Sequence, residues 1–580
     1  MQMGLYLTYR ELTDDSKDLQ YVIDALRPIS VHHFAFLITS VNALVRGVHT
    51  GISNENPGSL HFKLAASYLS SSLREAIERR FASASPYERP VFVPHVLLVL
   101  LRLALCYCEG VDVSREIRPE LHFELGKLCL ILNELMFNEA DAQALGNLIE
   151  SEKAETVMVQ MAAPFEAQNP SPASHIYHRV QIMYRILLND PNVQEDIRRR
   201  CRGFDFQKSF QNAMGVSVDR WLFIISAVYA YFMQSASPTG EETYAFLNAK
   251  TFIGSSSIDE DELFKVLSSL SFNTEYFGQG TELSEAVDYR HDLITFRSRP
   301  LVEIEPSVFI CADLSFLLEK CHLGLLWAIK ESLGTKNERD LLFTAWGVLF
   351  EHYVAWLLEG AKSNLTFARF HPTFFLDNGN EAFDGIELMG AIAVAEECKG
   401  GIFARNARYS QDRSKFVEEF DKKIGVGTKQ LATKVGSLFS ASSSSRRYLQ
   451  DIPLVQVKTV LPVLIVQDNI LRGPFMNWYA NRVFQLHLAK ENIELGINIR
   501  PLTLLHIREL EVIVNSLEVN DFDFIYALHN RAVRDPEMYT DLSSHLVSLG
   551  LSQTDSARSR SIRDAFFEPL MGYIFPNESV

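Results

Sequence analysis

Three acidic residues and one lysine occur in the C-terminal half of the chain in an order that suits phosphate chemistry. Glu351 lies in an apolar helical stretch, and Asp384 follows in the run FDGI. Glu397 and Lys399 lie further on, in the run EECKG. Hydrolysis of a phosphodiester needs an activated water and relief of the charge that builds on the phosphate, and carboxylates that bind Mg²⁺ or Mn²⁺ supply both. We therefore expect Asp384 and Glu397 to hold a cation, with Lys399 orienting the water and stabilising the phosphate charge.

The spacing of these residues indicates which side chains point the same way. The segment Ala391 to Lys399 has the composition of a β-strand, and the period of two in a strand puts Glu397 and Lys399 on one face. Cys398 points to the other face, but its backbone carbonyl could supply a third metal ligand. Glu396 could replace Glu397 if the strand were read in the opposite register, at the cost of its alignment with Lys399.

The elements that must position these residues alternate between helices and short strands. The apolar spacing predicts a helix, three strands, a second helix weakened by Gly425 and Gly427, and a buried strand. In chain order these are Leu341 to Leu358, Leu365 to Phe375, Ala382 to Leu388, Ala391 to Cys398, Lys415 to Leu438 and Val460 to Val466.

This order of elements and residues resembles the αβββαβ core of the PD-(D/E)xK, or restriction-endonuclease-like, nucleases. The resemblance covers the 130 residues from Glu338 to Gln467. It implies a metal site for Mg²⁺ or Mn²⁺ and a nucleic-acid substrate, with DNA favoured and RNA kept open. The roles that it implies are metal ligation by Asp384, Glu397 and the Cys398 carbonyl, catalysis by Lys399, and support from Glu351 and Gln430.

Each of these residues also has a structural interpretation. Phe383 stands where the family motif has proline, and Asp384 with Gly385 could form a turn. Glu397 and Lys399 could be a surface pair on an edge strand, and Glu351 a solvated helix residue. Gln430 shares a polar helix face that exposure would explain equally well.

Basic residues concentrate around the predicted site. Between residues 399 and 460 there are 12 lysines and arginines against 5 acids, whereas the whole chain carries a net charge of −17. Counterion release rewards basic surfaces, so any affinity for a polyanion should be local to this segment. We expect contacts with the phosphate backbone from Arg405, Arg408, Lys423, Lys434, Arg446 and Arg447.

The rest of the chain reads as helical, so the predicted fold class is α+β. Long amphipathic runs extend to about residue 164, and a second helical group spans residues 175–335 after a Pro/Ser/Asn-rich connection. Within that group, Val302 to Phe309 is expected to form a strand or hairpin leading into a helix from Leu314 to Leu333. The third predicted domain, residues 336–580, combines the nuclease-like core with a helical C-terminal extension whose role the sequence does not indicate.

Composition limits the class of protein. With 47% hydrophobic and 22% charged residues the chain is typical of a folded protein, and it contains no uninterrupted apolar stretch of about 18 residues and no secretory signal pattern. The seven cysteines are scattered, which argues against disulfides and a structural zinc. No phosphate-loop or dinucleotide fingerprint follows a predicted strand. We expect a soluble, cytoplasmic protein.

A long acidic helical region ahead of a nuclease domain resembles bacterial defence and restriction-like effectors, in which the extra region senses a trigger, selects a site or mediates assembly. An adaptor whose nuclease-like domain only binds nucleic acid, and a protein-binding scaffold, are the alternatives. The intact set of Asp384, Glu397 and Lys399 favours the enzyme, because a binding module has no need of all three.

Overall fold

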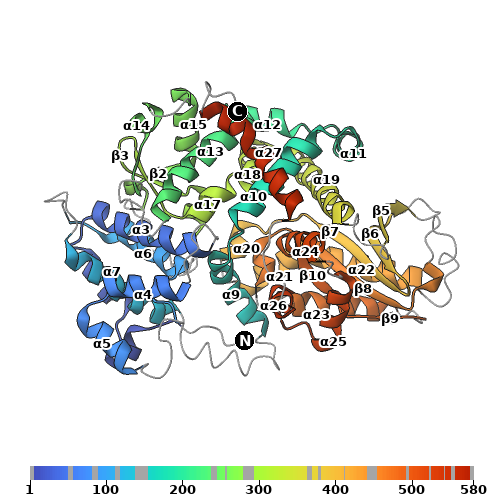
Figure 1. Cartoon of the computed structure of the whole chain (residues 1–580), viewed down its shortest axis with the longest axis horizontal. Coiled ribbons are helices and arrows are strands. Elements are labelled where there is room, and N and C mark those ends of the chain that lie inside the picture. Colours follow the sequence, from blue (N-terminus) through green and yellow to red (C-terminus); the bar gives the residue numbers. More distant parts are fainter. Residues whose placement is uncertain are drawn as a thin grey trace.

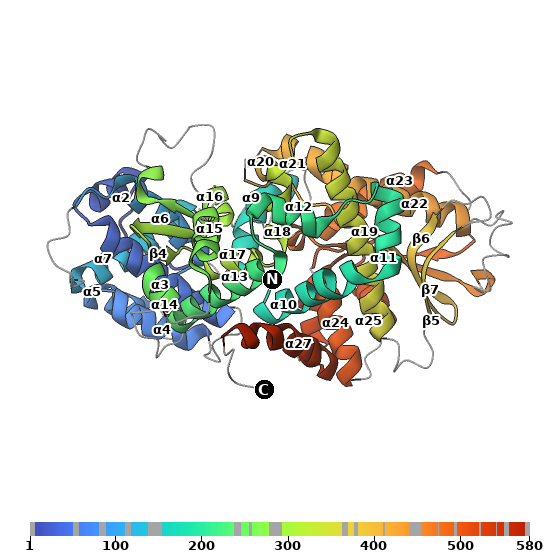
Figure 2. The same ribbon diagram turned by 90° about the horizontal axis from the view of Figure 1, so that it is seen from above.

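The computed structural model describes residues 6–49, 57–80, 89–110, 118–136, 154–236, 245–254, 258–277, 293–361, 369–375, 381–409, 412–439, 454–473, 475–491, 496–520, 524–540, 542–549 and 556–574. Helices dominate, and two separate β-sheets accompany them. The α+β class expected from the sequence is therefore present. The N-terminal helices lie at one end of the molecule and the larger sheet at the other, with helices from the middle of the chain between them (Figures 1 and 2).

The N-terminal helices pack around one apolar core. Helix α6 is buried along most of its length, because Pro94 starts it and nearly every following side chain is apolar. The core also includes apolar residues from the smaller sheet. The helices of this part are α1 (Tyr9–Thr13), α2 (Leu19–Leu26), α3 (Val31–His49), α4 (Pro57–Tyr68), α5 (Ser71–Arg80), α6 (Pro94–Tyr107) and α7 (Pro119–Met136). Helix α9 (Ala154–Gln168) follows, and its buried residues Met158, Val159 and Ala162 belong to a core of the larger sheet.

The middle of the chain is helical apart from the four-stranded sheet. The strands lie in the order β1-β4-β3-β2, and their bounds are β1 (Leu247–Asn248), β2 (Ser271–Asn273), β3 (Leu301–Glu305) and β4 (Val308–Cys311). The helices are α10 (Ala173–Val180), α11 (Pro191–Cys201), α12 (Phe206–Met214), α13 (Val218–Met233), α14 (Ala249–Gly254), α15 (Glu260–Leu270), α16 (Ile294–Ser298), α17 (Leu314–Glu319) and α18 (Leu323–Ser332). The π-helical turn η2 (Gln181–Ile186) continues α10.

The expected hairpin is confirmed as β3 and β4, but the single helix expected after it is two helices, α17 and α18. Backbone carbonyls at the break are satisfied by buried side chains from other elements. Trp221 donates to the Lys320 carbonyl at 3.0 Å, and Tyr184 donates to the His322 carbonyl at 3.1 Å. Because these donors replace the helical hydrogen bonds, the break costs little.

The larger sheet holds the residues singled out by the sequence. Its path is β10-β8-β7-β6-β5, with β9 (Asn498–Ile499) paired to β8. Strands β5 (Arg369–Phe375), β6 (Glu381–Met389) and β7 (Ile392–Lys399) form an antiparallel meander. Strands β8 (Thr459–Val466) and β10 (Thr503–His506) then add parallel to β7. The four strands expected between residues 365 and 466 are thus present.

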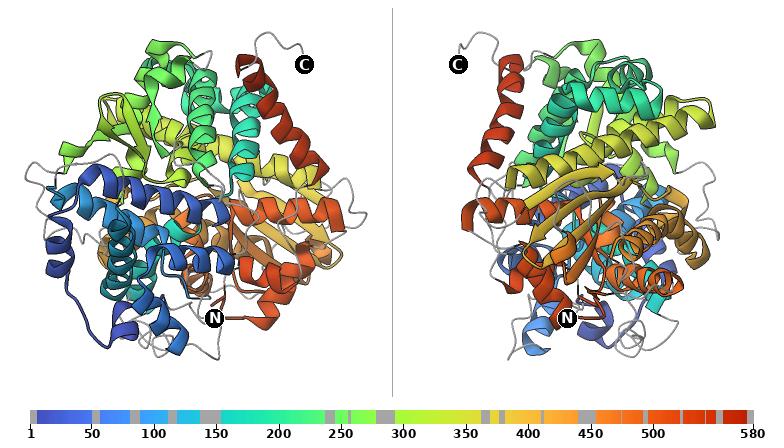
Figure 3. Two further views of the ribbon diagram at one scale, coloured as in Figure 1. Left: turned by 60° about the vertical axis from the view of Figure 1, so that its left-hand side comes forward. Right: turned by 90° about the vertical axis from the view of Figure 1, so that its right-hand side faces the viewer.

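Helices cover both faces of this sheet. Buried residues of α19 (Lys336–Ala361) and α24 (Ile507–Asn520) share a core with one face of β7 and β8. On the other face, α22 (Val426–Phe439) and α23 (Met476–Lys490) share a second core with the alternate residues of the same strands. The right-hand view of Figure 3 shows the sheet between these layers. Between β7 and α22 lie α20 (Arg405–Tyr409), α21 (Arg413–Phe420) and the π-helical turn η8 (Asp421–Gly425).

The C-terminal helices return to the helical part of the molecule. Helix α27 (Ala557–Ile574) lies beside α10, where Phe566 and Phe567 contact Tyr177 (Figure 1). Helices α25 (Phe524–Arg534) and α26 (Leu542–Ser548) follow α24. The core on the α19 side of the sheet includes residues from both sides of position 335, so the two parts share apolar contacts there.

Buried ion pairs connect segments that are far apart in the sequence. Arg46 of α3 binds Asp313, the N-cap of α17, at 2.6 Å with both side chains fully buried. Glu511 of α24 accepts from Arg179 and His175 of α10 and from Tyr353 of α19. Because an unpaired charge is costly in the interior, these pairs specify how the helices meet.

Two of the described helices are long and apolar enough to cross a membrane, over Val31–Val48 and Lys336–Gly360, and the bent pair α12 and α13 would make a third. The two windows are 67% and 56% buried inside the fold, respectively. More than half of each window is therefore covered by other parts of the fold.

Candidate active site

The register of β6 and β7 brings two acidic residues together. Gly385 pairs with Glu396 in the antiparallel ladder, so the next step along the strands sets Asp384 opposite Glu397. Directly opposed residues of antiparallel strands point to the same face. That face is the one covered by α22, because Ala393 and Ala395 of the same face belong to the core that α22 shares.

Asp384 is held by the backbone of the neighbouring strand. Its Oδ2 accepts a hydrogen bond from the Cys398 amide at 2.6 Å, where the two strands separate. Burial, followed by the carboxylates of Glu397 and Glu351, raises the pKa of Asp384 well above its usual value. The Asp384 carboxyl therefore lies among like charges, an arrangement that a bound cation would relieve.

Glu397 is nearly inaccessible and has a lysine on each oxygen. Its side chain is 3% exposed, Oε1 lies 2.7 Å from Lys399 Nζ, and Oε2 lies 2.8 Å from Lys434 Nζ. Lys399 comes from the same strand, two residues away, whereas Lys434 comes from α22. The expected pairing of Glu397 with Lys399 is thus present, and a second ammonium group joins it.

Lys399 lies against a glycine of α22. A Cβ at Gly427 would lie 2.8 Å from Lys399 Cγ, 3.0 Å from Lys399 Cε and 2.9 Å from Leu464 Cδ1. Glycine is therefore needed for the helix to approach β7 and β8 this closely. Burial alone lowers the pKa of Lys399, but the carboxylates of Glu397 and Asp384 outweigh it and raise the pKa, which keeps the ammonium charged.

Glu351 reaches the edge of this cluster from α19. It is close enough to Asp384 to contribute to the raised pKa of that carboxyl. Arg200, in the last turn of α11, holds Glu351 with contacts of 2.6 and 3.2 Å. The next residue, His352, contacts Asp196 of α11 at 2.9 Å. The α11 side of the site was missed by the sequence reasoning, because 151 residues separate Arg200 from Glu351 and no local pattern links them.

The contact from α22 to Glu397 comes from a residue other than Gln430, which the sequence had singled out for a supporting role. Gln430 is exposed on α22. Lys434, one turn further along, is the α22 side chain that contacts Glu397. A spacing of four residues on a helix shares a face, which is the signal that could have found Lys434 from the sequence.

The residues expected to contact phosphate lie in different surroundings. Lys434 belongs to the site itself, and Lys423 is half-buried, with its ammonium 5.4 Å from the Phe343 ring centroid. Arg405 begins α20, and its side chain lies outside the described residues, as do Arg446 and Arg447.

Arg408 is buried rather than presented to solvent, contrary to the expected phosphate contact. Its guanidinium pairs with Glu166 of α9 and binds both oxygens of Asp468 at 2.6 and 2.7 Å. Its side chain is 4% exposed. A charged group with internal partners at this depth holds elements together, so Arg408 leaves the set of proposed phosphate contacts.

The donor atoms of the residues present are of the type that binds a hard divalent cation. Asp384, Glu397 and the Cys398 carbonyl are oxygen donors of the type that Mg²⁺ and Mn²⁺ prefer, and Mg²⁺ usually keeps several waters. Within the described part of the chain, no group of three or more His, Cys, Asp or Glu side chains is arranged to hold a metal. A site here would therefore rest on two carboxylates, a carbonyl and water.

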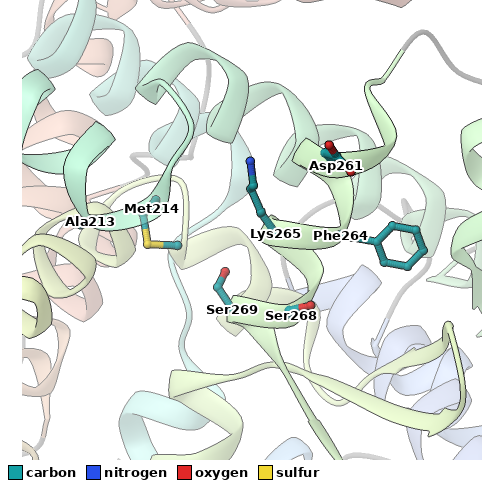
Figure 4. A pocket seen from close by; sticks show the side chains of 7 residues that line it. All are labelled: Ala213, Met214, Asp261, Phe264, Lys265, Ser268 and Ser269. Carbon is teal, nitrogen blue, oxygen red and sulfur yellow. The ribbon is translucent and has the colours of Figure 1, made fainter.

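A separate surface hollow lies between α12 and α15. It is lined by Ala213, Met214, Asp261, Phe264, Lys265, Ser268 and Ser269. In Figure 4, Lys265 and Ser269 lie on the side of α15 nearer to Met214, and Phe264 points away from Met214. One lysine, one aspartate and two serines around an open hollow define no particular chemistry, and none belongs to the Asp384 cluster.

Comparison with known proteins gives no match to a family model, to a curated protein or to a solved structure.

Proposed function

We propose that the chain is a Mg²⁺- or Mn²⁺-dependent endonuclease of the PD-(D/E)xK type, with DNA as the favoured substrate. The observation that carries this proposal is the juxtaposition of Asp384 and Glu397 on neighbouring strands, with Lys399 in contact with Glu397. The strand order supports it, because an antiparallel meander followed by a parallel strand is the order expected for that core. The proposed unit spans residues 336–580, behind helical units at 1–164 and 175–335.

In this proposal the two carboxylates and the Cys398 carbonyl would hold the cation, and a bound cation would neutralise charge on the phosphate and favour ionisation of a water. Lys399 holds the water and donates to a phosphate oxygen. The water oxygen bonds to phosphorus, the ester bond breaks, and the leaving oxygen takes up a proton to become an alcohol. The buried setting of Glu397 strengthens each of these interactions relative to water.

The helical region would act on this site through α11. Arg200 pairs with Glu351, and Asp196 of the same helix pairs with His352, so a change in the helical region would reach the acidic cluster through these contacts of α11 with α19. These contacts support a role for the helical region in sensing a trigger or selecting a target, as in a bacterial defence effector acting in the cytoplasm. That assignment rests on analogy of architecture.

The second candidate is an adaptor that binds nucleic acid without cutting it. One observation favours it, namely that both oxygens of Glu397 already have ammonium partners. A binding module could use such a cluster as a structural unit that holds β7 and α22 together. The two functions differ in whether a divalent cation binds at Asp384 and Glu397.

The decisive experiment is incubation of the purified chain with plasmid, linear duplex, single-stranded DNA and RNA, with Mg²⁺, with Mn²⁺ and with chelator. We expect cleavage that requires the cation. Lys399→Ala should abolish cleavage at every metal concentration, whereas Asp384→Asn should be partly rescued by excess metal. Nucleic-acid binding with no cleavage under any condition would replace the nuclease with the adaptor.

A further inference from the structure

We propose that Lys434 is an internal competitor of the divalent cation, so that the site takes up metal and nucleic acid together. This inference rests on the proposed nuclease function and concerns the regulation of its site. Its starting point is that Lys434 Nζ lies 2.8 Å from Glu397 Oε2, an oxygen that a cation would need.

Glu397 has two positive partners without any cation. Its side chain is 3% exposed, and the ammonium groups of Lys399 and Lys434 each contact one of its oxygens. Adding a divalent cation alone would place a further positive charge beside these two ammonium groups, which is unfavourable away from bulk water. Phosphate groups of a nucleic acid would offset that charge, so each ligand should favour the other.

Of the two lysines on Glu397, Lys434 is the one that can leave. The stem of Lys399 lies against Gly427 and Leu464, and its backbone is fixed in β7. Lys434 extends from α22 with its side chain 19% exposed, close to the 22% of Lys399, so the two lysines differ in the packing of the Lys399 stem and not in exposure. A rotation about the side-chain bonds of Lys434 would move the ammonium from Glu397 to an incoming phosphate without moving the backbone.

The resulting sequence of events is an exchange of partners. The phosphate takes the Lys434 ammonium, Glu397 Oε2 becomes available, and the cation takes that oxygen. By linkage, the cation strengthens nucleic-acid binding by the same factor as the nucleic acid strengthens cation binding. The site would then hold little metal until a nucleic acid is in place.

The experiment measures Mn²⁺ binding directly, by calorimetry, with the full chain alone and with a cleavage-resistant phosphorothioate DNA duplex. For the unmodified chain we expect the duplex to tighten Mn²⁺ binding by about 5- to 150-fold. In Lys434→Gln, which can still donate a hydrogen bond to Glu397 but lacks the charge, Mn²⁺ should bind the free protein more tightly. In this variant the duplex should tighten Mn²⁺ binding much less than it does in the unmodified chain.

Two further variants serve as controls. Lys429→Gln alters an exposed lysine of the same helix and should leave both Mn²⁺ affinities unchanged. Lys434→Arg keeps the charge and should keep weak Mn²⁺ binding in the free protein. Equal Mn²⁺ affinity of the unmodified chain and Lys434→Gln, with and without duplex, would overturn the competition while leaving the nuclease intact. Absence of Mn²⁺ binding in every variant, with duplex present, would overturn the proposed function as well.

Discussion

The substitution Arg408→Ala tests whether Arg408 stabilises the fold or binds nucleic acid. In the folded chain its guanidinium lies between Glu166 and Asp468, and Asp468 also accepts from the Phe403 amide. Arg408→Ala would leave two buried carboxylates with fewer donors. We expect a loss of stability, and no specific loss of nucleic-acid affinity.

The size of the loss follows from what remains around each carboxylate. Asp468, whose side chain is fully buried, keeps the amides of Phe403 at 2.7 Å and Ile470 at 3.2 Å. Glu166 keeps Arg297 at 2.6 Å. Removing one partner of a buried pair costs about 3–5 kcal/mol, and the remaining donors put the expected cost near the lower end, at about 3 kcal/mol. Burial alone raises the pKa of Glu166, but Arg297 and Arg408 outweigh it and lower the pKa.

The assay is urea-induced unfolding followed by tryptophan fluorescence, compared between Arg408→Ala, Arg413→Ala and the unmodified chain. Arg413 is 53% exposed and pairs with Glu155, so its loss should cost less than about 1 kcal/mol. Because a chain of this length need not unfold in one step, the first transition is the one to compare. Unchanged unfolding of Arg408→Ala with weakened binding of DNA would refute the structural role and return Arg408 to the phosphate-contacting surface.

Three further predictions follow from the same structure. Gly427→Ala should displace Lys399 and reduce cleavage by about 100-fold with little change in folding, as measured by initial rates and thermal unfolding; near-normal rates would show that Lys399 tolerates the shift. Lys423→Gln should flatten the dependence of log K for DNA on log salt by about 0.9, and an unchanged slope in binding titrations would remove Lys423 from the interface. Burial raises the pKa of Glu511, but Arg179 and His175 outweigh it and hold the pKa well below its usual 4.5. The stability that Glu511 contributes is therefore present above that pH and lost as pH falls through the lower pKa of the folded state. Glu511→Gln should cost about 3–5 kcal/mol at neutral pH and much less in acid, and an equal cost at both pH values in urea unfolding would contradict this pairing.

The main elements around the candidate site could be predicted because their signals are local. Apolar-rich runs marked β6, β7 and β8, and the alternation of side chains with a period of two placed Glu397 and Lys399 on one face. The same alternation explains why the two faces of the sheet divide between separate apolar cores. Strand existence and facing direction depend on neighbours only one or two residues away, which a sequence displays directly.

The partners of these residues depended on the tertiary structure. Arg408 looked like any other member of a basic segment, and only the approach of α9 and of the loop at Asp468 made it an internal cation. Gln430 and Lys434 lie on one polar helix face, and the docking angle of α22 decided which of them met Glu397. Charged side chains are long and flexible, so composition alone does not decide between solvent and a buried partner.

By itself, the sequence determined the order of the four strands β5 to β8 and of the helix before them, the α+β class, and the set of oxygen and ammonium groups available for phosphate chemistry. Tertiary structure decided which charges neutralise one another, from Arg200 on Glu351 to the two lysines on Glu397. The reason is the sequence separation between the residues that determine each feature. Backbone periodicity is set by adjacent residues, whereas an ion pair between elements 37 or 151 residues apart exists only after the cores beneath them have packed.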